Sequence, residues 1–171
     1  MSSNFVHLHV HTEYSVLDGA CRVKDLLNTV KAQEMPAVAI TDHGNMFGVI
    51  DFYQKADSIG VKPIIGFEAY TAPVSRFDKK AKQGEETSYH LTLLAKNNIG
   101  YKNLMKLTSI GYMEGFYYKP RIDLESLFQH KEGLIVLSGC MTSEFSGYLL
   151  RNKDEEAEKY LDKMIQEFGK D

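Results

Sequence analysis

The stretch that decides the fold spans residues 37–69 and reads AVAITDHGNMFGVIDFYQKADSIGVKPIIGFEA. It begins with an apolar run at residues 37–40, which has the length of a short buried strand. Apolar residues then recur at the spacing of one helix face: Met46, Val49, Ile50 and Tyr53. Gly60 suits the end of that helix, and residues 63–69 form a second apolar run. The stretch therefore predicts a strand, a helix and a second strand in succession.

The same alternation continues on both sides, starting at residues 5–11, which alternate as in a strand with the odd positions on one face. A helix pattern follows at Val23, Leu26, Leu27 and Val30. Residues 90–95 and 134–137 have the pattern of further strands, and residues 101–112 have that of a helix. Residues 71–88 are rich in charged and small residues and predict a long loop. A β/α alternation of this kind predicts a parallel sheet or barrel with its chemistry at the carboxyl ends of the strands.

The clearest helix pattern lies near the end of the chain, where apolar residues form one stripe: Ala157, Tyr160, Leu161, Met164, Ile165 and Phe168. Acidic residues in its first turn and Gly169 after its last turn suit the two ends of a helix. Since a stripe of this size buries enough apolar area to dock a helix, we expect it to pack against the wall of the barrel.

The composition is that of one folded domain without a strong charge preference. The 171 residues are 43% hydrophobic and 25% charged, with a formal net charge of -3 and a pI of about 6.1. This composition lacks the excess of basic residues that is typical of an autonomous nucleic-acid-binding protein. If the domain meets DNA, something other than this domain must therefore hold the DNA. The lysine run at Lys79, Lys80 and Lys82 is interpreted as a solvated loop, with a phosphate-contacting role as the alternative.

Cysteine usage and hydropathy indicate a cytoplasmic protein. Cys21 and Cys140 are far apart and outside any CxxC motif, which argues against a disulfide scaffold. The first residues lack a basic region followed by an apolar run, and no stretch approaches about 18 apolar residues. We therefore expect no association with a membrane.

The strongest local sign of chemistry is the sequence His9-Val10-His11. Residues two apart on a strand project to the same side, so both imidazoles can reach one metal ion. His7 shares that face, so a histidine on this strand is not automatically a ligand. The alternative is a pair of histidines in the barrel interior that are satisfied by hydrogen bonds.

Further candidate ligands recur near the predicted strand ends: Asp18, Asp42, His43, Glu68, His90 and Cys140. Imidazole, thiolate and carboxylate suit zinc and its neighbours, and so many groups imply two or three ions. The carboxylate of Glu68, in an apolar strand, is costly unless it is paired or bound to metal. Asp18 could instead be a turn or cap residue, and Cys140 a small buried apolar residue. His90 stands at the amino-terminal end of its strand, which breaks the simple pattern.

Several strings of this sequence together resemble one known family: FVHLHVHTEYSVLDG at residues 5–19, AITDHGNMFG at 39–48, KPIIGFEAY at 62–70, HLTLLA at 90–95, GFYYKPRID at 115–123 and LSGCMTSE at 137–144. They resemble the polymerase-and-histidinol-phosphatase (PHP) domain, in the form found at the amino terminus of bacterial C-family replicative DNA polymerases. The last two strings separate polymerase-type members from the small phosphatases of the family. The resemblance spans nearly the whole chain.

The resemblance implies an α/β fold, a distorted (β/α)7 barrel of TIM-like type. It also implies a cluster of up to three divalent ions, zinc or manganese, at the strand ends. The implied ligands are His9 and His11 at a first ion, His90 and Cys140 at a second, Asp18 and His43 at a third, and Glu68 as a bridge between two ions. Glu68 and His43 are further implied to act in catalysis.

One departure from the family pattern is that no Asp-x-His pair follows Cys140. Residues 1–171 are therefore expected to form the N-terminal part of a PHP domain, without its closing strands and without polymerase domains. The barrel would then be incomplete, and the ions that depend on the missing pair would bind weakly.

The implied activity is metal-dependent phosphoester hydrolysis, as a 3′ to 5′ exonuclease that proofreads within a DNA-directed DNA polymerase. In residues 1–171 alone this activity is expected to be weak or absent. The implied partners are the DNA primer 3′ end, reached through the full-length polymerase, and other replication polymerase subunits. Two alternatives stay open. One is a catalytically silent, metal-stabilised module that supports the polymerase and binds its partners, and the other is a free-standing phosphatase for a small substrate such as histidinol phosphate. The string GFYYKPRID argues against the free-standing phosphatase.

Overall fold

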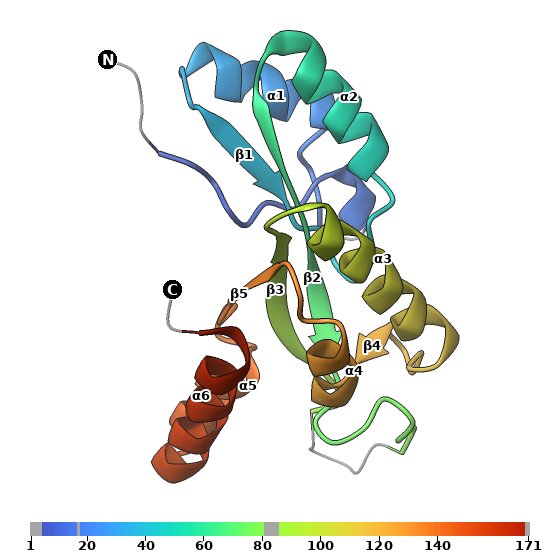
Figure 1. Ribbon diagram of the computed structural model, residues 1–171, viewed down its shortest axis with the longest axis vertical. Helices are drawn as coiled ribbons and strands as arrows, with labels where there is room; N and C mark the ends of the chain where they lie inside the picture. Colours follow the sequence, from blue (N-terminus) through green and yellow to red (C-terminus); the bar gives the residue numbers. More distant parts are fainter. Residues whose placement is uncertain (1–4, 17, 81–85, 170–171) are drawn as a thin grey trace.

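The computed structural model describes residues 5–16, 18–80 and 86–169, and Lys82 of the predicted lysine run lies outside this part. The strands are β1 (Ala37–Ile40), β2 (Lys62–Thr71), β3 (Tyr89–Ala95), β4 (Arg121–Ile122) and β5 (Leu134–Leu137). The α-helices are α1 (Val23–Ala32), α2 (Val49–Ile59), α3 (Asn98–Met113), α4 (Leu124–Gln129), α5 (Glu144–Leu150) and α6 (Asp154–Phe168). Figure 1 shows α1 and α2 beside the upper part of the sheet, α3 alongside β2, and α5 and α6 together at the lower left. No helix in the described ranges is both long and apolar enough to cross a membrane.

The sheet is open and mixed, and the predicted (β/α)7 barrel is not seen in the described part of the chain. Its 5 strands have the order β1-β2-β3-β5, and β4 pairs with the end of β2. β1 and β4 run parallel to β2, whereas β3 runs antiparallel to both β2 and β5. The expectation of a purely parallel arrangement is therefore wrong at β3.

The direction of β3 follows from the connection that precedes it. Parallel neighbours need a crossover connection, usually a helix that packs on the sheet. β2 is followed by the predicted loop, found here at residues 72–80 and 86–88, and these residues contain no helix. The chain returns beside β2 in the opposite direction, with His90 opposite Tyr70.

Residues 5–11 do not form the predicted strand. Only His7 pairs with β1, through an isolated parallel bridge to Val38. The segment nevertheless stays beside β1, because the N–H of Thr41 donates to the carbonyl of Val10 at 2.8 Å. The alternation of faces survives, since Val10 packs against a hydrophobic core while the histidines on either side of it contact a buried carboxylate.

Two hydrophobic cores pack against the sheet. The first lies between α1, α2 and β1 and includes Leu27 and Phe52. The second lies between β2, β3, α3 and α4 and includes Phe67 and Leu107. Gly60 ends α2 with a φ of 74°, a left-handed conformation that glycine adopts without strain. The strand–helix–strand unit at residues 37–69 is thus confirmed.

Helix α6 docks through only part of its predicted apolar stripe. Ala157 is buried, and Met164 and Phe168 pack against the second core. Leu161 is 45% exposed, so this residue of the stripe stays at the surface, while Tyr160 beside it is half-buried. The helix packs beside α5 and β5 instead of a barrel wall.

A network of ion pairs anchors the first part of the loop that follows β2. The Arg76 guanidinium donates to Asp123 Oδ1 at 3.0 Å and to Glu114 Oε2 at 2.7 Å. Asp123 also caps α4 by accepting from the N–H of Ser126 at 3.0 Å. Burial raises the pKa of Asp123, but the hydrogen bonds from Arg76 and Ser126 outweigh it and hold that pKa below its ordinary value of 3.8.

Replacing Asp123 by asparagine is expected to make stability less sensitive to acid. Because the pKa of Asp123 is lower in the folded chain than in the unfolded chain, its contribution is complete above about pH 4 and is lost as the pH falls through the folded value. Urea denaturation at a series of pH values should show a shallower fall of the unfolding free energy below about pH 4 in Asp123→Asn than in the unmodified chain. Parallel curves for the two proteins would contradict this expectation.

Candidate metal centre

Glu68 lies at the centre of a cluster of histidines. Its side chain is 1% exposed, and both of its carboxylate oxygens face imidazole nitrogens. Oε1 lies 3.2 Å from His9 Nε2. Oε2 lies 2.5 Å from His43 Nδ1, 3.1 Å from His90 Nδ1 and 3.8 Å from His11 Nε2. One buried carboxylate on β2 therefore meets imidazoles from three other segments of the chain.

Sheet pairing explains why two of these imidazoles reach Glu68. On one edge of β2, His43 pairs with Glu68 through an isolated parallel bridge just after β1. On the other edge, antiparallel β3 places its first residues beside the last residues of β2, so His90 lies opposite Tyr70. Tyr70 is two residues from Glu68 and shares its face of the strand. The position of His90 at the start of its strand is therefore a result of the reversed direction of β3.

Buried Asp42 holds the segment that carries His9 and His11. Its Oδ1 accepts hydrogen bonds from the N–H of Thr12 at 2.6 Å and from the Ser15 hydroxyl at 2.8 Å. Ser15 Oγ lies 3.4 Å from His11 Nδ1 and accepts from the N–H of His43 at 3.2 Å. Asp42 therefore positions two imidazoles through Ser15, as the outer partners of metal ligands commonly do.

The electrostatics favour the metal-binding forms of Glu68 and His11, whereas they favour the protonated form of His43, which does not bind metal. Burial raises the pKa of Glu68, but the contacts with His43, His9 and His90 outweigh it and hold that pKa well below its usual range. The pKa of His43 is raised, chiefly by its contact with Glu68 and further by Asp18. The pKa of His11 is lowered, first by burial and then by the neighbouring His43. Ionised carboxylate and neutral imidazole are the forms that coordinate metal ions.

The donor atoms fit divalent cations better than they fit one another. His43 Nδ1 and Glu68 Oε2 are buried 2.5 Å apart, yet within the described residues neither makes a hydrogen bond of acceptable geometry. Two groups have all their donor atoms within 4.8 Å of one another: His9, His11 and Glu68, and His43, Glu68 and His90. Imidazole nitrogen and carboxylate oxygen are donors that suit zinc and manganese.

The remaining two predicted ligands lie differently. Asp18 Oδ2 is 2.9 Å from His43 Nε2, so Asp18 reaches the cluster through His43. Cys140 belongs to neither donor group in the described residues, and its Sγ lies 2.9 Å from Thr142 Oγ1. The main chain beside it is close to the site, because the N–H of His90 donates to the carbonyl of Thr142 at 3.2 Å.

Two residues beside the cluster were not singled out from the sequence. The ring of Tyr70 stacks on His43 with centroids 5.8 Å apart, and Lys119 Nζ lies 4.4 Å from the centre of the Tyr70 ring. Burial, and then the charge of Glu68, raises the pKa of Tyr70 to about 12, so its hydroxyl stays protonated at neutral pH. The string GFYYKPRID contains Lys119, but only the pairing of β4 with the end of β2 brings it to the site.

The amino-acid sequence assigns the chain to a protein family. The sequence model of the PHP domain matches residues 7–171, so the chain belongs to the PHP domain family. The chain is 53% identical over 168 residues to DNA polymerase III subunit alpha of Thermus aquaticus, covering 96% of this chain and 14% of that protein. It is 50% identical over 169 residues to DNA polymerase III subunit alpha of Borreliella burgdorferi, covering 99% of this chain and 15% of that protein. It therefore matches the N-terminal region of these relatives and spans 14% to 15% of their length.

A solved structure offers a weaker likeness. An amidohydrolase from Chromobacterium violaceum, with bound sulfate and no metal, aligns with 63% of this chain and 34% of its own, at a TM-score of 0.42 and 19% identity. A likeness of this strength bears on neither the fold nor the function.

Proposed function

We propose that this chain is a metal-dependent phosphoesterase domain that removes nucleotides from a DNA primer 3′ end, as a 3′ to 5′ exonuclease. The observation that carries the proposal is the convergence of four imidazoles on the two oxygens of buried Glu68. The similarity to DNA polymerase III subunit alpha supports three further proposals. The whole protein would be a cytoplasmic DNA-directed DNA polymerase, its partners would be DNA and other replication polymerase subunits, and residues 1–171 would be the N-terminal part of its PHP domain.

The proposed ligands surround Glu68, and the donor group of His43, Glu68 and His90 is divided between two ions. His9 and His11 would hold a first ion with Glu68, and His90 would hold a second with Glu68. His43 and Asp18 would hold a third, and Cys140 would join the second if its side chain turns away from Thr142. When bound, zinc or manganese would supply a Lewis acid that lowers the pKa of water from 15.7 to about 7 and neutralises charge on the phosphoryl oxygens.

Glu68 and His43 are the proposed catalytic residues. Glu68 is common to both donor groups, so its charged carboxylate would hold the imidazoles of both groups around the ions. His43 contacts Glu68 through Nδ1 and Asp18 through Nε2. It would therefore keep the two carboxylates at a fixed separation while the phosphodiester is held and cleaved.

Lys119 would bind the phosphodiester next to the metal centre. Its side chain is exposed and forms no ion pair with any carboxylate of the described residues, although it lies over the ring of Tyr70. A lysine ammonium in this position can attract a phosphate oxygen, and the protonated hydroxyl of Tyr70 can donate a hydrogen bond to another.

Replacing Lys119 by alanine is expected to lower kcat/KM for primer digestion by about tenfold or more, since the hydrogen bond to a charged group is lost. Metal content should stay unchanged, because Lys119 is not among the donor atoms. Steady-state kinetics and metal analysis of the same preparation would check both expectations. Lys119→Arg, which keeps the charge, serves as the control and should retain most of the activity. Unchanged kinetics in Lys119→Ala would remove Lys119 from the proposed site.

The test of the proposed function combines metal analysis with digestion of a labelled primer. The chain is loaded with zinc or manganese and supplied with a 5′-labelled primer, and we expect weak, stepwise shortening from the 3′ end together with release of nucleoside monophosphates. Bound metal without any cleavage would favour the structural-module alternative. Cleavage of a small phosphomonoester but not of the primer would favour the small-molecule phosphatase. Absence of bound metal at saturating concentrations would overturn the proposal.

A further inference from the structure

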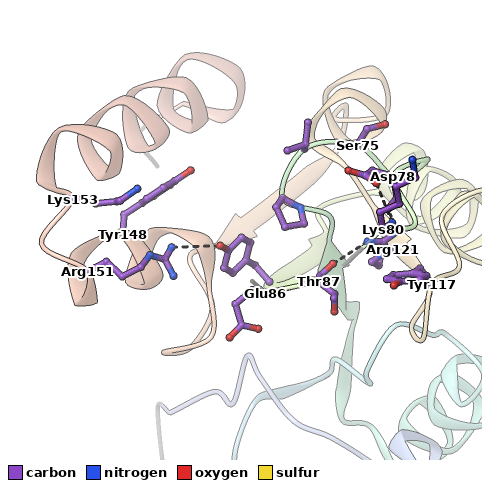
Figure 2. Close-up of a pocket in the computed structure, with 13 residues that line it drawn as sticks. Ser75, Asp78, Lys80, Glu86, Thr87, Tyr117, Arg121, Tyr148, Arg151 and Lys153 are labelled. Carbon is purple, nitrogen blue, oxygen red and sulfur yellow. Dashed lines mark hydrogen bonds between the residues drawn. The ribbon is translucent and has the colours of Figure 1, made fainter. Parts of the chain in front are cut away.

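A pocket lies on the opposite side of β3 from the candidate metal centre. Its volume is about 390 Å³, and it is lined by residues of the loop after β2, the start of β3 and the junction of α5 with α6. Figure 2 shows Arg151, Lys153 and Tyr148 on one wall and Arg121, Lys80 and Tyr117 on the other. Tyr89 lines the pocket and His90 belongs to the metal cluster. Adjacent residues of a strand point to opposite faces, so the two sites are separate.

A buried positive charge lines this pocket. The side chain of Arg121 is buried, and its guanidinium donates to main-chain carbonyls, among them Thr87 O at 3.0 Å and Asp78 O at 2.7 Å. No carboxylate of the described residues forms an ion pair with it. A buried guanidinium that bonds only to neutral acceptors keeps its uncompensated positive charge. A bound anion would stabilise that charge.

The other cations of the lining are only weakly engaged. The Arg151 guanidinium donates to the Tyr89 hydroxyl at 3.4 Å and, within the described ranges, makes no ion pair. Lys153 Nζ lies 3.9 Å from Glu156 in an exposed pair, which is worth little. Among the described residues, the lining contains four cationic and two acidic side chains: Lys80, Arg121, Arg151 and Lys153, and Asp78 and Glu86. It is therefore locally positive in a chain whose net charge is -3.

Aromatic rings complete the lining, in the form of Tyr89, Tyr117 and Tyr148. Tyr148 is held in place because its hydroxyl donates to Glu144 Oε1 at 2.8 Å, while its ring lines the pocket. A fixed phenol ring is a surface on which a nucleobase can stack, and stacking does not require a particular base. The volume of about 390 Å³ lies within the range of small-ligand pockets.

We infer that this pocket binds a nucleoside 5′-phosphate, with the phosphate held by Arg151 and Lys153 in the field of buried Arg121 and the base against Tyr148. Guanidinium and ammonium groups are the side chains that bind phosphate, and a tyrosine ring supplies the apolar face that a base needs. The inference is independent of metal binding, because no residue of the Glu68 cluster lines the pocket.

Isothermal titration calorimetry of the 171-residue chain in EDTA tests this inference without involving the metal centre. The ligands are deoxyadenosine 5′-monophosphate, deoxyadenosine and inorganic phosphate. We expect the monophosphate to bind at least tenfold more tightly than either of its parts, because only the monophosphate engages both the cations and the ring. Equal binding of inorganic phosphate would overturn the role of the base, and equal binding of the nucleoside would overturn the role of the cations. No binding of the monophosphate at millimolar concentration would overturn the site.

The variants distinguish the pocket from the rest of the surface. Arg151→Ala should weaken binding of the monophosphate by about tenfold or more, the change expected when a hydrogen bond to a charged group is lost. Lys159→Ala removes an exposed cation of α6 outside the pocket, so it should leave binding unchanged. Arg121 is avoided because its removal would leave carbonyls unpaired and could unfold the chain. Equal affinity of Arg151→Ala and the unmodified chain would overturn the inference.

A 5′-phosphorylated DNA tetranucleotide identifies the source of the ligand. If it binds as tightly as the monophosphate, the pocket takes the 5′ end of a DNA strand. If it binds more weakly, the pocket takes the free nucleotide. Both results support recognition of a nucleoside 5′-phosphate, and the loss of affinity in Arg151→Ala should appear with either ligand.

Discussion

Replacing Glu68 by glutamine is expected to lower metal affinity by at least about 100-fold, since even the outer partners of metal ligands are worth 10–100-fold. Glu68 is the one residue that belongs to both donor groups, so its loss affects every ion held by them. Glutamine keeps the size of the side chain and removes its charge. The imidazoles of His9 and His43 then face a neutral amide in place of a carboxylate. Primer digestion should fall below detection in the same preparation.

Metal content by mass spectrometry of the purified chain, with dissociation constants from chelator competition, would check this result. Glu155→Gln is the matched control, because Glu155 is 88% exposed on α6 and lies in neither donor group. It should bind metal like the unmodified chain. Full metal affinity in Glu68→Gln would contradict the assignment of the centre, whereas lost activity with retained metal would limit Glu68 to catalysis.

Replacing Asp42 by alanine is expected to destabilise the fold by about 3 kcal/mol or more, because it leaves buried donors without an acceptor. The donors concerned are the N–H and hydroxyl of Thr12 and the hydroxyl of Ser15. For a chain of this length, such a loss corresponds to a decrease in Tm of roughly 6–12 °C. Metal affinity should fall as well, since Ser15 would no longer hold His11 and His43 in place.

Thermal and urea unfolding of Asp42→Ala beside Asp162→Ala would measure this effect. Asp162 is exposed on α6, so its replacement should change the unfolding free energy by no more than about 0.5 kcal/mol. A second variant, Ser15→Ala, separates positioning from most of the stability effect. It keeps the bonds from Thr12 to Asp42 and removes the Ser15 hydroxyl, which bonds to Asp42 and links it to His11 and His43. We expect Ser15→Ala to lose more metal affinity than stability. Stability of Asp42→Ala equal to that of Asp162→Ala would contradict the proposed role of the network.

The elements that the sequence predicted correctly have burial patterns that the sequence shows directly. α1 places Val23, Leu27 and Val30 in the first core, and β1 is buried along its whole length. A helix with one buried face has apolar residues with a period of 3.6, and a fully buried strand has a short apolar run, so both can be recognised without knowing the neighbouring elements.

The elements that were missed are short or defined by their partners. β4 has 2 residues, α4 has 6 and α5 has 7, which is too few for a repeating pattern. The direction of β3 could not be derived from residues 90–95, because an alternating strand has the same pattern in either direction. Residues 5–11 alternate as predicted, but alternation alone does not supply a partner strand along their whole length.

The candidate site was inferred from the sequence through ligand chemistry to a greater extent than through geometry. His9, His11, Glu68 and His90 could be grouped because their residue types suit one kind of ion, and the structure brings their donor atoms together around Glu68. Cys140 met the same chemical criterion, yet its Sγ contacts Thr142. The positions of Lys119 and Tyr70 depend on how β4 pairs with β2, which residue types alone do not reveal.

Residues 5–11 are held to the sheet by few backbone contacts, so this segment is expected to open locally more often than the strands. This segment pairs with β1 through one isolated bridge, whereas β2 is bonded along both of its edges. Opening free energies are lowest where few backbone hydrogen bonds hold a segment, so its amides should exchange with deuterium faster than those of β2. His9 and His11 could then detach while Glu68 and His90 remain on the intact sheet. The donor cluster would then open only on the side of residues 5–11. Amide hydrogen exchange that is equally slow in residues 5–11 and in β2 would exclude this motion.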